Sequence, residues 1–249
     1  MTDQTALEST GCKVLKQIGK GAFGTVFLVV ESNFGIAAAK VMDLQHFNEC
    51  EWEAAGKVSK QANICQYVIN YKGAQIIQDH AIILMEYANL PPLQKIFDCK
   101  LTPLLREDFI KSIMWQLLNG ISVIHQAGLI HRDLKADNIM FHNIYGSDQV
   151  IVKITDFGLA REVGTIGTGM TQCGTPLGMA PEILMGSNQF EVGKSQLQEQ
   201  KGQNNKLDIW SLGVLFFQLL TKRYPFEANN IMQLIKTCQQ IDLQNALIY

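Results

Sequence analysis

The stretch that most constrains this 249-residue chain runs from His131 to Asn138 and reads His-Arg-Asp-Leu-Lys-Ala-Asp-Asn. It is too polar for a core and too compact for a plain linker. Asp133 can accept a proton from a hydroxyl, Lys135 can lie over a transferring phosphate, and Asn138 can offer a carbonyl oxygen to a metal. Phosphoryl transfer needs these groups, because its transition state demands positioning and charge neutralisation. We favour this interpretation over a polar loop with ordinary capping residues, because these residue types are rare together.

The composition indicates a soluble globular protein of one or two domains, with 47% hydrophobic and 18% charged residues. The net charge of −2 argues against a broad binding surface for nucleic acid or anionic membrane. The six cysteines contain no C-x-x-C pair, which predicts reduced thiols rather than a zinc site or a disulfide framework. No signal peptide is visible, and the longest apolar run, Leu212–Phe217, is too short to span a bilayer. We therefore expect no membrane span and a cytoplasmic or nuclear location.

A glycine-rich motif lies near the start of the chain, with Gly19, Gly21 and Gly24 in G-x-G-x-x-G spacing. Such glycines let the backbone approach phosphate oxygens, but the same spacing marks dinucleotide-binding folds and plain hairpin turns. Strands predicted at Val14–Ile18 and Thr25–Val30 favour a strand–turn–strand unit, because residues 25–30 are poor helix formers. Taken alone, the motif supports phosphate binding and a plain turn about equally.

Lys40 is the single charge in an apolar strand predicted at Ile36–Met42. A lysine there can be an edge residue whose amino group reaches water. Placed one strand after the glycine loop, it is better interpreted as the cation for the α- and β-phosphates of a nucleotide. Such a lysine needs a carboxylate, and a helix predicted at about Asn48–Ser59 supplies Glu51, our choice among three glutamates in that helix.

The periodicity of the chain changes after its first third. Strands are predicted around Gln66–Tyr71 and Ala81–Met85, and Glu86–Pro92 then breaks the pattern as an inter-lobe hinge. Beyond it, apolar residues at helical spacing predict a long amphipathic helix over Arg106–Gln126. The sequence therefore predicts a strand-rich first part and a helix-rich remainder.

A hairpin is predicted after the polar stretch, from Ile139–Phe141 and Val150–Ile154. It ends at Thr155-Asp156-Phe157-Gly158, which is an ordinary turn on one interpretation. With Asn138 upstream, Asp156 adds a second oxygen ligand suited to Mg²⁺, which takes few carboxylates and completes its shell with phosphate and water.

The remaining segments alternate between polar and apolar. Ala180-Pro181-Glu182 opens a helix that reaches about Met185, and Ser187–Lys206 is predicted to be a flexible surface insertion rather than a docking segment. Asp208–Leu220 is nearly all apolar, which predicts a helix buried at the centre of a helical lobe. Ile231–Gln239 is predicted to form a last amphipathic helix.

Six motifs in this order resemble the eukaryotic protein kinases over nearly the whole chain. They are the glycine loop with Val26, Ala38-Ala39-Lys40, His131–Asn138, Asp156-Phe157-Gly158, Ala180-Pro181-Glu182 and Asp208–Gly213. Lys135 and the Thr175 of Gly-Thr-Pro resemble the serine/threonine type. The groups most similar are the calmodulin-dependent and autophagy-initiating kinases.

The resemblance implies an α+β, bilobal kinase-like fold over residues 12–249. It has an antiparallel N-lobe with one helix (12–88) and a mainly helical C-lobe (89–249) without the family's last helices, with the insertion at 187–206. Magnesium and ATP would bind between the lobes. The residues expected to bind ATP are Ile18, Gly19, Lys20, Gly21, Ala22, Phe23, Gly24, Thr25, Val26, Ala38, Lys40, Glu51, Met85, Glu86 and Ala88.

The resemblance also implies roles at the centre of the site. Asp133 would act as the base, assisted by Lys135 and Lys40, while Asn138 and Asp156 would hold Mg²⁺. Protein or peptide Ser/Thr hydroxyls would be the substrates. Lys40, Asp133 and Asp156 are all present, which favours an active kinase over a pseudokinase or scaffold. The Gly-Thr-Pro and Ala-Pro-Glu motifs disfavour a small-molecule phosphotransferase.

The last expectations concern regulation and two departures from the family's usual sequence. Arg132 would pair with a phosphate on Thr171, or on Thr168 as second choice, added by an upstream kinase. Gly178 stands where the family commonly has an aromatic residue, which predicts a looser substrate shelf. The acidic residue that often binds the ribose is missing near Pro92.

Overall fold

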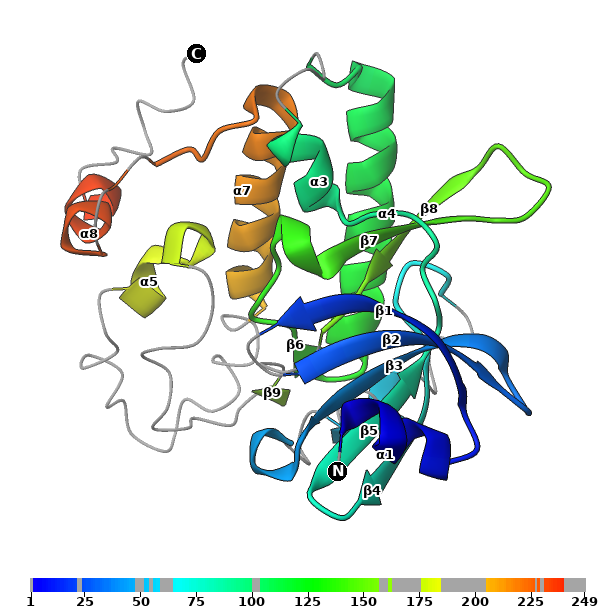
Figure 1. Cartoon of the computed structure of the whole chain (residues 1–249). Helices are drawn as coiled ribbons and strands as arrows, with labels where there is room; N and C mark the ends of the chain where they lie inside the picture. The colour runs from blue at the N-terminus through cyan, green and yellow to red at the C-terminus, as the bar shows by residue number, and fades with distance from the viewer. Residues whose placement is uncertain are drawn as a thin grey trace.

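A five-stranded antiparallel sheet forms the first part of the fold (Figure 1). The structure is a computed structural model that describes residues 2–21, 24–47, 52–53, 56–58, 65–99, 104–156, 161–162, 176–184, 205–226, 228 and 231–239. The strand order is β1-β2-β3-β5-β4. The strands are β1 (Lys13–Gly21), β2 (Gly24–Glu31), β3 (Gly35–Asp43), β4 (Tyr71–Ile77) and β5 (His80–Met85).

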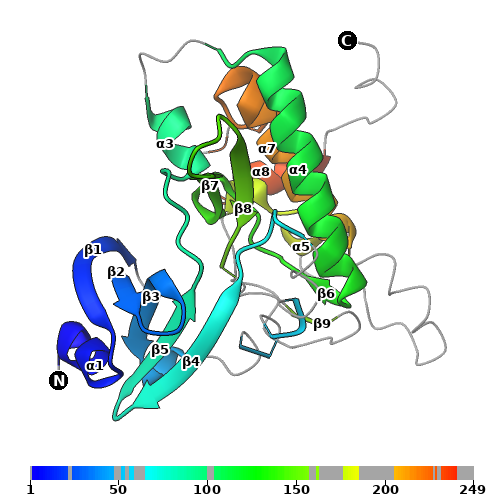
Figure 2. The same cartoon turned by 90° about the vertical axis from the view of Figure 1, so that its right-hand side faces the viewer.

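The two faces of the sheet contribute to two clusters of buried residues, the main core and a second core. One face carries Ala38, Ile83 and Met85, which join the main core together with residues of the helical part. The opposite face packs beneath a short helix, α1 (Asp3–Ser9), whose Ala6 and Leu7 are fully buried. Figure 2 shows α1 on the side of the sheet that faces away from the helices.

The second part is mainly helical, with a small hairpin beside the helices (Figure 2). Its helices are α3 (Leu93–Asp98), α4 (Glu107–Gln126), α5 (Pro181–Leu184), α7 (Lys206–Thr221) and α8 (Ile231–Gln239). Its strands are β6 (Leu129–Ile130), β7 (Ile139–Asn143), β8 (Val150–Ile154) and β9 (Arg161–Glu162), with β6 paired to β9 and β7 to β8. Short 3₁₀ turns are η1 (Leu44–His46), η2 (Ala136–Asn138) and η3 (Pro176–Gly178).

Helix α4 follows the amphipathic pattern closely. Ile113, Leu117, Ile121 and Ile124 are at most 2% exposed and enter the main core at helical spacing. The helix packs against β8 and α7, as both views show (Figures 1 and 2). It therefore forms the support on which the polar loop at residues 131–138 is placed.

Three expectations need correction. The strand predicted around Gln66–Tyr71 begins only at Tyr71, because residues 67–69 hydrogen-bond instead to Ile154 of β8. Helix α7 is not buried all round, since Ile209 is 51% and Phe216 44% exposed. The predictions also missed α1 and α3.

Two predicted segments fall largely outside the described residues. Of the helix predicted at about 48–59, residues 52–53 and 56–58 are described, and they are helical. Of the insertion predicted at 187–206, residues 205 and 206 are described, and Lys206 begins α7.

The predicted fold class is confirmed, because an antiparallel sheet precedes a mainly helical part that lies beside it. Within the described part of the chain, no helix combines the length and apolar character needed to cross a bilayer.

Candidate active site

One buried carboxylate, that of Asp208, holds the start of the loop at residues 131–138. Asp208, near the start of α7, is fully buried and accepts the backbone N–H groups of His131 and Arg132, each at 2.9 Å. Its Oδ2 also lies 2.8 Å from Nε2 of His125, near the end of α4. Arg132 itself has a left-handed φ of 67°. Two helices thus fix the direction in which the loop leaves β6.

The ring of His131 ties the loop to the end of β8. It is completely buried, and its Nδ1 accepts the N–H of Asp133 at 3.3 Å. Its Nε2 lies 3.1 Å from the carbonyl oxygen of Thr155 and therefore donates to it. These two contacts fit the tautomer that carries its proton on Nε2.

Asp133, Lys135 and Asn138 form a hydrogen-bonded cluster. The amino group of Lys135 donates to Asp133 Oδ2 at 2.8 Å, and Asn138 Nδ2 donates to the same oxygen at 3.0 Å. Asn138 Nδ2 also donates to the Asp133 carbonyl at 2.8 Å. By contrast, Asp133 Oδ1 is buried and has no hydrogen-bond partner among the described residues. Because a buried acceptor without a partner is costly, this oxygen is suited to receive a hydroxyl from a ligand.

Lys40 and Asp156 meet at the junction between the sheet and the helical part. Lys40 Nζ lies 3.5 Å from Asp156 Oδ1, with side-chain exposures of 17% and 39%. Asp156 has a left-handed φ of 68°, and the preceding Thr155 donates its N–H to the Asn138 carbonyl at 3.0 Å. The two predicted metal ligands thus belong to adjoining stretches of backbone.

The donor set fits a hard cation. Asn138 donates its amide nitrogen to Asp133, so its Oδ1 stays available as a ligand. Asp156 supplies a partly exposed carboxylate. Mg²⁺ commonly takes one or two protein oxygens and completes its octahedron with phosphate and water.

Val26, Ala38, Lys40 and Met85 share one face of the sheet, whereas the predicted Thr25 pairs with Val41 and projects to the opposite face. Val26 pairs with Lys40, and Ala38 pairs with Met85, so their side chains project to the same side. Gly24 pairs with Gly21 at the tip of the β1–β2 hairpin. A Cβ on Gly24 would lie 2.2 Å from the carbonyl oxygen of Val41 in β3. The close approach of β3 therefore requires glycine at this position, whether or not a phosphate binds.

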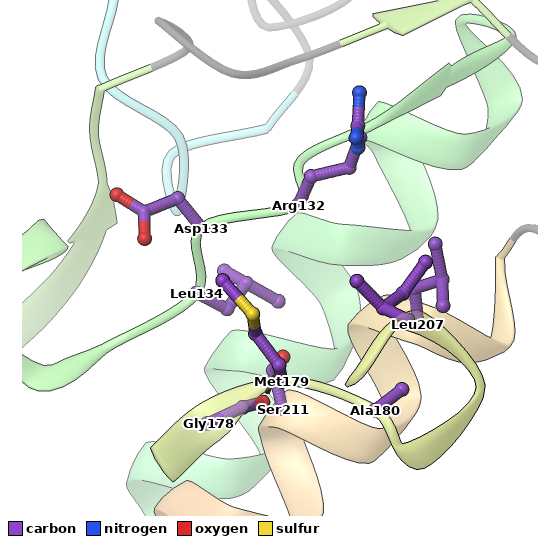
Figure 3. A pocket seen from close by; sticks show the side chains of 9 residues that line it. Arg132, Asp133, Leu134, Gly178, Met179, Ala180, Leu207 and Ser211 are labelled. Atoms are coloured by element: carbon purple, nitrogen blue, oxygen red, sulfur yellow. Dashed lines mark hydrogen bonds between the residues drawn. The ribbon is translucent and has the colours of Figure 1, made fainter. Parts of the chain in front are cut away.

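A small pocket lies beside Asp133, between the loop at 131–138, the segment before α5, and α7 (Figure 3). Its lining combines apolar side chains, such as Leu134 and Met179, with the polar Arg132, Asp133 and Ser211. Gly178 faces the open side, since a Cβ built there meets nothing within 4 Å, and its carbonyl accepts the Ser211 hydroxyl at 3.1 Å. The looser substrate shelf expected at Gly178 stays a prediction.

Ala22, Phe23, Glu51, Phe157, Gly158, Thr168 and Thr171 lie outside the described residues. The sequence analysis also missed His125, Lys153 and the Glu86 carboxylate. Their partners are distant in sequence, and no local pattern marks these contacts.

Comparison with known proteins assigns the family. The family described as "Protein kinase domain" matches residues 12–247. The chain belongs to this family. Among the kinases that it resembles, the probable serine/threonine-protein kinase fhkA of Dictyostelium discoideum is 32% identical over 86% of this chain and 38% of its own length. The human serine/threonine-protein kinase Nek5 is 32% identical over 91% of this chain and 30% of its own length.

The predicted resemblance to protein kinases of the serine/threonine type is thereby confirmed. This kinase chain spans about a third of the length of these two relatives.

Proposed function

We propose that this chain is a serine/threonine kinase domain that transfers the γ-phosphate of ATP to Ser or Thr hydroxyls of proteins. The observation that carries the proposal is the asymmetry of the Asp133 carboxylate. One oxygen is held by Lys135 and Asn138, whereas the other is buried with no partner among the described residues. A carboxylate fixed in this way keeps one acceptor unused, and the proposal assigns that oxygen to the substrate hydroxyl.

In the proposed reaction, Asp133 Oδ1 accepts the hydrogen bond of the substrate hydroxyl and orients its oxygen toward the γ-phosphorus. A new P–O bond forms to that oxygen, the bond to the β-phosphate oxygen breaks, and ADP leaves with the electron pair. The hydroxyl proton passes to Asp133. Lys135, 2.8 Å from Asp133, places a positive charge beside the transferring group.

The nucleotide would lie against the sheet face formed by Val26, Ala38 and Met85, with Ile18 at its edge. The backbone of Glu86 and Ala88 would hold the adenine, and Lys40 would bind the α- and β-phosphates. The proposal retains Glu51 as the partner that holds Lys40. When bound, Mg²⁺ would neutralise phosphate charge, held by Asn138 and Asp156.

The decisive experiment measures phosphate transfer from labelled ATP to a mixed peptide library. We expect transfer by the wild type and a loss of at least about a hundredfold in Asp133→Asn, because the general base is removed. Asp137→Asn is the matched control, since Asp137 is an exposed acid in the same loop. Nucleotide binding without transfer by the wild type would instead indicate a pseudokinase.

We also propose that Arg132 pairs with a phosphate on Thr171, added by an upstream kinase. An arginine beside the base can order the segment that bears a phosphothreonine. Thr171→Ala should therefore lower the activity of protein activated in cells by several-fold. Equal turnover by the phosphorylated and unphosphorylated forms would rule out this switch. For the cellular location we propose the cytoplasm.

A further inference from the structure

Lys153 is a buried cation outside the catalytic cluster. It lies in β8 and is 6% exposed, in a strand whose neighbours Val152 and Ile154 are completely buried. A lysine is rarely buried unless its charge is paired. Its Nζ lies 2.6 Å from Oε1 of Glu86, which directly follows β5.

Glu86 is fixed by a second segment as well. Its Oε2 accepts the N–H of Asn70 at 3.2 Å, and its own N–H donates to the Asn70 carbonyl at 2.8 Å. Lys153, Glu86 and Asn70 therefore form one cluster, which joins β8, the residue after β5 and the segment before β4.

The backbone beside this cluster is also held by hydrogen bonds between β8 and the segment before β4. Ile69 donates its N–H to the Ile154 carbonyl at 2.8 Å, and Ile154 donates to the Tyr67 carbonyl at 2.9 Å. Helix α4 packs directly behind, since a Cβ on Gly120 would lie 2.7 Å from Ile154 Cδ1. The cluster thus rests on a tightly packed base and has little freedom to shift.

The two ends of the cluster lead to the two halves of the nucleotide site. Glu86 belongs to the connection after β5 that is proposed to hold adenine through its backbone. Lys153 stands three residues before Asp156, which contacts Lys40 and is a proposed metal ligand. A fixed distance between Glu86 and Lys153 therefore fixes the adenine-binding backbone relative to the phosphate- and metal-binding acid.

We propose that Lys153 is a positioning residue for ATP, acting through Glu86 to hold the adenine-binding backbone in register with Asp156. The inference rests on the proposed nucleotide site. Lys153 itself is not a ligand of ATP, because its amino group is directed to the Glu86 carboxylate. Its loss should weaken ATP binding while it leaves peptide binding unchanged.

The test compares Lys153→Met, Glu86→Gln and the double variant with the wild type. Dissociation constants for a non-hydrolysable ATP analogue with Mg²⁺ are measured by calorimetry, and KM is measured for ATP and for peptide. Lys111→Met is the matched control, because Lys111 pairs with Glu107 on α4 at side-chain exposures of 74% and 77%. Hydrogen exchange over residues 86–90 reports the connection directly.

We expect each single change to weaken nucleotide binding on the order of tenfold, with faster exchange at residues 86–90. The double variant should bind no more weakly than either single variant, since both changes break the same contact. Should Lys153→Met fail to fold, Glu86→Gln and the double variant still decide the matter. The double variant keeps the site packed without an unpaired charge, because Lys153→Met removes the cation and Glu86→Gln removes the carboxylate.

Three results would overturn the inference. They are an unchanged dissociation constant with a lowered unfolding midpoint, additive losses in the double variant, and no nucleotide binding by the wild type. Failure of the proposed function is distinguishable. Suppose that the wild type binds the analogue and that Lys153→Met weakens this binding, yet the wild type transfers no phosphate. The proposed kinase activity would then be wrong, whereas the positioning role of Lys153 would stand.

Discussion

At the scale of single residues, the position of the loop at residues 131–138 depends on Asp208. It is fully buried and accepts two backbone N–H groups of the loop and contacts His125. We predict that Asp208→Ala lowers the free energy of unfolding by about 3 kcal/mol, because it leaves buried donors without an acceptor. Denaturant unfolding measures the change. Asp98→Ala, which removes an acid that is 51% exposed, should stay within about 0.5 kcal/mol. Equal effects of the two changes would contradict this account.

The sequence brought Asp133, Lys135 and Asn138 together as one predicted cluster but gave no sign of its supports. Asp133, Lys135 and Asn138 lie within six residues of one another, so their cluster follows from local spacing. Asp208 was recognised as part of a helix motif, whereas its contacts with His125 and the loop depend on how α4 and α7 pack. Such contacts join residues 76 to 83 positions apart, which no local pattern encodes.

At the scale of elements, alanine substitutions at two glycines, Gly120 and Gly213, test how tightly α4 packs against β8. A Cβ on Gly120 would meet Ile154 Cδ1 at 2.7 Å and the Tyr67 carbonyl oxygen at 3.3 Å, and Ile154 has no exposed surface into which to move. We predict that Gly120→Ala lowers the free energy of unfolding by about 1 kcal/mol, because overpacking outweighs the gain in helix propensity.

Gly213 provides the control in another helix. A Cβ there meets nothing within 4 Å, and the residue is exposed in α7. Gly213→Ala should therefore raise the free energy of unfolding by about 0.5 to 1 kcal/mol. Chemical denaturation of both variants tests the pair. A stabilising Gly120→Ala would mean that α4 and β8 are less tightly packed than the structure indicates.

Elements with strong periodicity were predicted well, and those defined by distant partners were not. Helix α4 was predicted one residue early, and α8 was predicted with its observed bounds, because each carries an apolar stripe. Val68 and Ile69 suggested a strand, but they pack beside β8 before β4 begins. Helix α1 has Ala6 and Leu7 as its buried residues, too few for a helical pattern to stand out.

At the scale of the whole molecule, α1 extends the folded unit beyond the family match. The match to the kinase family begins at residue 12, whereas α1 ends at Ser9. Yet Leu7 is fully buried in the second core, together with Val29, Val41 and Leu84 of the sheet. The outer face of the sheet would expose this core if α1 were absent. We infer that α1 is part of the cooperative unit that positions Lys40.

This inference gives a prediction for Leu7→Ala. Removing a buried leucine side chain should lower the free energy of unfolding by about 2 to 4 kcal/mol, because apolar contact is lost and a cavity remains. Leu15→Ala is the matched control, since Leu15 on β1 is 47% exposed. Denaturant unfolding should show one cooperative transition for both variants. A separate early transition in Leu7→Ala, with the main transition unmoved, would show that α1 docks independently and that the sheet holds Lys40 without it.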